Sequence, residues 1–90
     1  MKYTRYLASV VKENGPLQLS CPQFRRMMNI VYAEGVKHGL QQAKRTYKGT
    51  PQFYRYDVLI FKTERQIVDL TGNETPENLI KEMHRMSQYN

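Results

Sequence analysis

A chain of 90 residues with a formal net charge of +6 has room for one domain, a small hydrophobic core and a cationic surface. Its 40% apolar content suffices for a core, and no apolar run reaches the length of about 18 residues that a membrane-spanning helix needs. The single cysteine, Cys21, excludes an internal disulfide and has no neighbours at zinc-ligand spacing. We therefore expect one folded cytoplasmic domain over residues 1–90, with no metal and no cofactor.

The positive charge is concentrated in the middle of the chain. Residues 21–49 contain six basic residues and one acidic residue, a net charge of +5, whereas residues 50–90 contain five basic and six acidic residues. A localised cationic surface favours a polyanionic partner, nucleic acid before anionic lipid. The alternative is a charge that serves only solubility.

The first part of the chain predicts two helices with a short strand between them. Apolar residues recur at helical spacing over residues 2–14, and Gly15-Pro16 ends that helix. Residues 17–19 alternate in polarity as a short strand does. A capping-box pattern at residues 20–23, with a proline in the first turn, predicts the start of the second helix.

Residues 24–48 contain two apolar stripes that one straight helix cannot bury on a single side. At about 100° per residue, the stripe that begins at Phe24 points roughly 130° away from the stripe that begins at Val36. A break between Asn29 and Gly35 lets both segments face one core, so we predict two helices joined by a short turn. The competing interpretation is one bent helix.

The second part of the chain predicts a hairpin followed by a helix. Residues 52–61 and 66–70 are rich in aromatic and β-branched residues, which favours two strands. The alternative is a helix that begins at Asp57 or Thr63. A threonine followed by a proline and an acid then predicts a last helix over residues 75–88.

The predicted order is helix, strand, helix, helix, strand, strand, helix. Over residues 2–72 it resembles the winged helix-turn-helix domains of DNA-binding proteins. The segments that carry the resemblance are residues 13–20, the basic helix, and residues 49–58, which resemble the wing of excisionase-type and MerR-type proteins. The resemblance implies an α+β fold in which the third helix, residues 36–48, enters the major groove while the hairpin touches the DNA backbone or minor groove.

Carried over to this chain, the resemblance makes the polar residues of the third helix the candidates for DNA contacts. Arg or Lys can pair with guanine and Gln with adenine in the major groove. The candidates on this helix are Lys37, Gln41, Lys44, Arg45 and Lys48. The phosphate candidates are Arg25 and Arg26 at the start of the second helix, and Lys62 and Arg65 at the tip of the wing.

We therefore predict a small DNA-binding regulator of phage or plasmid type, a transcriptional or recombination accessory protein that binds duplex DNA. The last helix is expected to form a homodimer or to close the core. The alternative hypothesis is a protein-interaction module that docks its basic helix on a partner, including a nucleic-acid-processing enzyme, and modulates it. The sequence has no nucleophile motif and no phosphate-cradling glycine loop, so we expect neither enzymatic activity nor a membrane partner.

Overall fold

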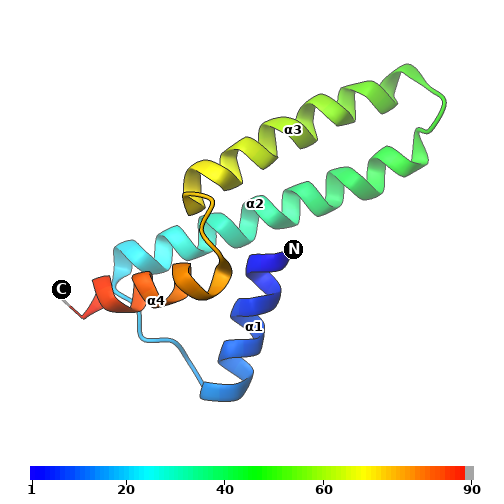
Figure 1. The fold of residues 1–90 in the computed structure, drawn as a ribbon. Helices are drawn as coiled ribbons and strands as arrows, with labels where there is room; N and C mark the ends of the chain where they lie inside the picture. The colour runs from blue at the N-terminus through cyan, green and yellow to red at the C-terminus, as the bar shows by residue number, and fades with distance from the viewer. Residues whose placement is uncertain (89–90) are drawn as a thin grey trace.

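The computed structural model describes residues 1–88, which form four helices joined by short loops (Figure 1). The helices are α1 (Lys2–Asn14), α2 (Cys21–Thr46), α3 (Pro51–Thr71) and α4 (Pro76–Ser87). Helices α2 and α3 form a long antiparallel hairpin, α4 lies beside the N-terminal half of α2, and the N-terminal end of α1 meets the middle of α2 (Figure 1). Residues 1–88 contain no strand, so the predicted α+β winged helix-turn-helix fold is wrong.

Helix α1 has the bounds that the sequence predicted. It ends at Gly15, whose φ of 80° suits a residue without a Cβ and whose N–H donates to the Val11 carbonyl at 2.9 Å. Residues 17–19, predicted as a strand, belong to the loop that follows and have no strand partner within the described chain. An alternating tripeptide has too few backbone groups to form a strand without a neighbour to pair with.

Helix α2 is continuous, so the predicted break at residues 29–35 is wrong, and of the competing interpretation, one bent helix, the single helix is observed. Its apolar residues face different surroundings along its length, and some of them, such as Phe24 and Met28, are exposed. Met27 and Ile30 pack in the core with α1 and α4, whereas Tyr47 at the C-terminal end stacks on Tyr56 of α3 with ring centroids 5.5 Å apart. A helix whose neighbours change along its length changes its buried side without breaking.

Helix α3 occupies the residues that were predicted to form the wing, so the strands at 52–61 and 66–70 and the turn between them are wrong. Aromatic and β-branched residues favour strands on average, but strand propensity depends strongly on context. Here Ile60, Thr63 and Ile67 recur every three or four residues and are buried or half-buried along the hairpin. This helical period, which packs against α2, outweighs the propensity.

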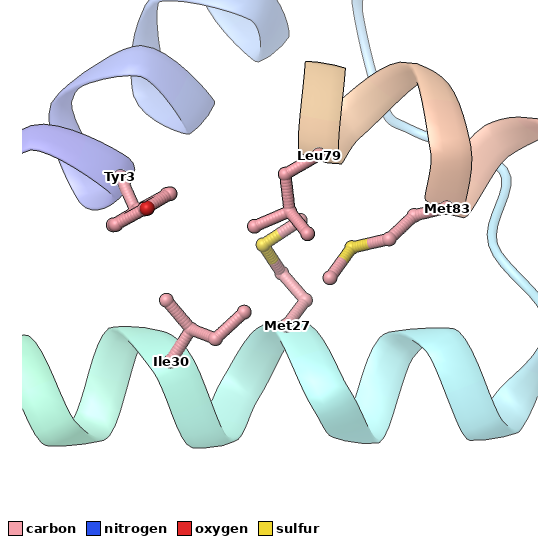
Figure 2. Close-up of a cluster of buried hydrophobic side chains, with 5 residues drawn as sticks. All are labelled: Tyr3, Met27, Ile30, Leu79 and Met83. Carbon is pink, nitrogen blue, oxygen red and sulfur yellow. The ribbon is translucent and has the colours of Figure 1, made fainter. Parts of the chain in front are cut away.

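Helix α4 begins where the sequence predicted. The Thr75 hydroxyl accepts a hydrogen bond from the Asn78 N–H at 3.3 Å, which caps the first turn. Leu79 and Met83 are fully buried and extend toward Met27 of α2 (Figure 2). Of the two roles expected for this helix, the structure shows closure of the core.

The buried core lies toward one end of an elongated molecule. Tyr3 of α1 and Ile30 of α2 complete the cluster formed with α4 (Figure 2). Beyond it, the C-terminal half of α2 runs beside α3 without a third helix (Figure 1), and we call this part, residues 40–60, the arm. The molecule measures 50 × 24 × 20 Å. Because the arm is only two helices thick, side chains on its outer sides are left uncovered.

Candidate functional site

Two predicted DNA contacts on the basic segment, Lys37 and Lys44, are directed at α3. Lys37 Nζ lies 3.4 Å from a carboxylate oxygen of Glu64. Lys44 forms an ion pair with Asp57 and places its ammonium 4.5 Å from the centre of the Phe53 ring. Ion pairs that are this exposed stabilise a fold by at most about 1 kcal/mol. They do, however, neutralise both lysines, which makes these residues poor candidates for phosphate contacts.

The other three candidates on this segment remain accessible. Gln41, Arg45 and Lys48 are exposed and line a shallow groove between α2 and α3. Within residues 1–88, Arg45 and Lys48 have no ion pair. The structure therefore brings together two unpaired cations and one amide near the end of the arm.

The two arginines at the start of α2 differ in their surroundings. Arg25 is exposed, as a phosphate contact requires. Arg26 is half-buried, donates its Nε–H to the Leu70 carbonyl at 3.2 Å and lies 3.7 Å from a carboxylate oxygen of Glu82. Arg26 thus connects α2 to the end of α3 and to α4, which gives it a structural role.

Lys62 and Arg65 lie in the middle of α3, not at the tip of a hairpin, because the wing is absent. Both side chains are exposed and form no ion pair with the described residues. Both residues are therefore accessible, as expected, but they do not lie on a wing that could bring them to a phosphate.

A surface not predicted from the sequence runs along α3. Tyr54, Val58, Phe61 and Val68 are 70%, 54%, 59% and 43% exposed, and at about 100° per residue they fall on one side of the helix. That side points roughly 130° away from the side containing Ile60 that packs against α2. We call these four residues the outer face of α3. These residues are four, three and seven positions apart, a spacing that places them on one side of a helix. Because the segment was predicted as strands, the sequence alone did not reveal this surface.

Three cations lie beside or within the outer face of α3. Arg55, Lys62 and Arg65 are exposed and have no ion pair within residues 1–88, while one carboxylate, Asp69, lies near the C-terminal end of the face. The other two acids of α3 are already neutralised by the lysines of α2. At about 100° per residue, Arg55 and Lys62 lie along one edge of the apolar face, whereas Arg65 lies on the face itself, between Phe61 and Val68.

Comparisons of this chain with protein-family models, with characterised proteins and with solved structures give no match. The function is therefore argued from the geometry of the chain itself.

The described residues offer surfaces for noncovalent binding. None of the helices in residues 1–88 is long and apolar enough to cross a membrane. In the same range, no group of three His, Cys, Asp or Glu side chains is placed to hold a metal ion. The features that remain are apolar helix faces and unpaired cations, both of which bind macromolecules.

Proposed function

We propose that the chain is a protein-interaction module that binds an acidic helical surface of a partner protein through the outer face of α3. One observation supports this above all: four large apolar side chains are exposed on one side of a helix whose other side is already packed. Contiguous apolar patches of this kind mark interaction sites in soluble proteins. Helix-in-groove recognition uses apolar anchors at similar spacing.

The charges beside the outer face favour an acidic partner. No carboxylate of the described chain pairs with the three cations of α3, Arg55, Lys62 and Arg65. Carboxylates of a partner can therefore form ion pairs with them. Such complementarity speeds association and disfavours basic partners. Most of the affinity is expected from Tyr54 and Phe61, because buried aromatic side chains are frequent anchors of protein interfaces.

The proposal is tested with two synthetic amphipathic peptides that share a leucine seam, one flanked by glutamates and the other by lysines. We expect the protein to prefer the acidic peptide in a fluorescence anisotropy titration. Phe61→Glu should weaken that binding about tenfold or more, because it places a charge in the centre of the apolar face. The side chain is 59% exposed, so the substitution leaves the fold intact.

Gln42→Glu is the matched control, because it adds the same charge to an exposed helical position on α2, away from the outer face of α3 and from its cations. It should leave the affinity for the acidic peptide within about twofold of the wild-type value. Equal binding to both peptides, or equal losses in the two variants, contradicts the proposal.

A second candidate function is binding of duplex DNA, as a transcriptional or recombination accessory regulator. It is supported by Arg45 and Lys48, which are exposed and unpaired within residues 1–88 near the turn between α2 and α3. The net charge of +6 adds long-range attraction to a polyanion. Contacts of this kind go mostly to phosphate and do not need a winged helix.

This second function predicts a strong dependence of DNA affinity on salt. Replacing Arg45 and Lys48 together by Ala should weaken binding at low salt and reduce the slope of log affinity against log salt by roughly two. The control pair, Lys37→Ala with Lys44→Ala, should have a smaller effect because both lysines are already neutralised by α3. Absence of binding at low salt, in a titration with labelled duplex, rules this function out.

A further inference from the structure

Helix α2 has an exposed side that contacts no other helix of the described chain. Met28, Tyr32 and Val36 are 40%, 73% and 37% exposed and follow one another at intervals of four residues. Beside this row of large side chains runs a parallel row of small residues, also at intervals of four: Gly35, Gly39 and Ala43. At about 100° per residue, all six positions fall within a sector of roughly 100°. We call them the paired rows of α2.

Neither glycine is explained by the chain itself. Gly35 and Gly39 lie inside a regular helix without positive φ, and a Cβ added at either one meets no atom within 4 Å. A glycine inside a helix costs roughly 1 kcal/mol relative to alanine. A tight turn or a crowded contact within the chain is therefore not the reason for these residues. A side chain from another molecule, laid over the helix, would use the open space.

We propose that the paired rows of α2 bind the same rows of a second copy of this chain across a twofold axis. An antiparallel crossing centred between Gly35 and Val36 places each large side chain opposite a small one. Tyr32 then faces the partner's Gly39, Met28 faces the partner's Ala43, and Val36 faces the partner's Gly35. Each contact occurs twice, as a twofold interface requires. A parallel pair in register would instead set Tyr32 against Tyr32 and leave the glycines facing each other.

The packing geometry of helices supports this arrangement. Rows of residues at intervals of four form the ridges and grooves of a helix surface, and interdigitation of such rows from two helices gives a crossing angle of about −50°. Here the ridge of one copy, residues 28–36, fits the groove of the other, residues 35–43. The order of large and small residues makes the surface complementary to itself, which favours a second copy over an unrelated partner.

The charges also suit a second copy. Each chain carries a net charge of +6, so self-association requires an interface from which cations are absent. Between residues 28 and 46 the charged residues of α2 lie elsewhere: Glu34 is buried beneath α1, Lys37 and Lys44 pair with α3, and Arg45 is exposed but points roughly 130° away from the middle of the paired rows. The sector that contains the paired rows has only uncharged side chains over this range.

The accessible area predicts a dimer of modest affinity. The three large side chains of the row offer on the order of 300 Å² per copy, or roughly 600 Å² for the pair. Exposed backbone at the glycines adds to this value. Such an interface is smaller than the roughly 1,000 Å² that stable specific complexes bury, so the dimer should be weak and should dissociate on dilution.

The test measures molar mass by sedimentation equilibrium from low to high micromolar protein. We expect the wild-type chain to form a dimer as the concentration rises. Tyr32→Glu and Gly39→Lys should each weaken the dimer about tenfold or more, the first by placing two charges in the interface and the second by filling the space above the helix. Gln41→Glu, which adds a charge to α2 away from the paired rows, should leave dimerisation unchanged.

Mixing the two variants tests the register. A heterodimer of Tyr32→Glu with Gly39→Lys has one wild-type contact and one new pair of opposite charges, so association should return toward the wild-type level. Circular dichroism of each variant checks that the fold is retained. A wild-type chain that stays monomeric at high concentration, a dimer insensitive to both substitutions, or a mixture no stronger than its components each overturns the proposal.

Discussion

The carboxylate of Glu34 replaces the capping side chain that α1 lacks. Met1 at the N-cap offers no acceptor, and Glu34, only 6% exposed, accepts hydrogen bonds from the Tyr3 N–H at 3.1 Å and the Thr4 N–H at 2.6 Å. The Thr4 hydroxyl donates to the same carboxylate at 2.6 Å. A negative charge at this position also suits the positive end of the α1 dipole. One buried residue of α2 therefore fixes where α1 begins.

We predict that Glu34→Ala lowers the free energy of unfolding by about 2–4 kcal/mol, because it leaves two N–H groups at the start of α1 without an acceptor. Glu34→Gln should lose less, since its amide oxygen can still accept. Urea denaturation followed by circular dichroism measures both. The control is Glu64→Ala, which removes a 48% exposed partner of Lys37 and should cost at most about 1 kcal/mol. Equal losses in the two alanine variants contradict the capping role.

At the scale of elements, the local sequence predicted where helices begin and end better than it predicted whether the residues between form one helix, two helices or strands. The end of α1 and the starts of α2 and α4 followed from glycine, proline and the Thr75 cap, all of which act within one turn of the chain, although the Ser20 side chain at the start of α2 makes no capping hydrogen bond. The continuity of α2 could not be predicted from such local signals, because the residues that its apolar side chains contact are distant in sequence. No property of residues 29–35 reveals that Met27 contacts α4 while Tyr47 contacts α3.

Helix α3 shows why a helix with two apolar sides is mistaken for a strand. Its inner side, with Ile60, and its outer face, with Phe61, are both apolar, so adjacent residues are apolar and the helical period is obscured. The dense aromatic and β-branched composition then favours a strand. The feature that concealed the helix is also the one that supports a partner-binding role.

The candidate site could be predicted only in part, because local sequence does not show which residues become neighbours after the helices pack. Exposure of Arg45 and Lys48 followed from their positions on the polar side of the predicted basic helix, whereas Arg65 is exposed although the wing from which it was predicted is absent. The pairing of Lys37 and Arg26 could not be predicted, because their partners belong to α3 and α4 and become neighbours only after the helices pack. Charge counted along a sequence overstates the cationic surface wherever acids from another element lie opposite.

At the scale of the whole molecule, stability is unequally distributed along the hairpin. One side of residues 27–34 of α2 is covered by α1 and α4, and the core side chains Met27 and Ile30 on that side are almost completely buried. The arm, residues 40–60, is held by contacts between two helices alone (Figure 1). The outer face of α3 and the paired rows of α2 both extend onto this part, where a bound partner would bury the side chains that the chain itself leaves exposed.

We therefore predict that backbone amides of α2 exchange with solvent at two distinct rates. In dilute protein, where the chain is monomeric, amides of residues 40–46 should exchange about tenfold or more faster than those of residues 27–34, because opening the arm exposes little of the core. Hydrogen exchange measured by NMR resolves the two groups. The variant Glu34→Ala serves as the internal control: it loosens α1 and should raise exchange at residues 27–34 more than in the arm. Uniform exchange along α2 in the wild-type chain would show that the arm and the core open as one unit.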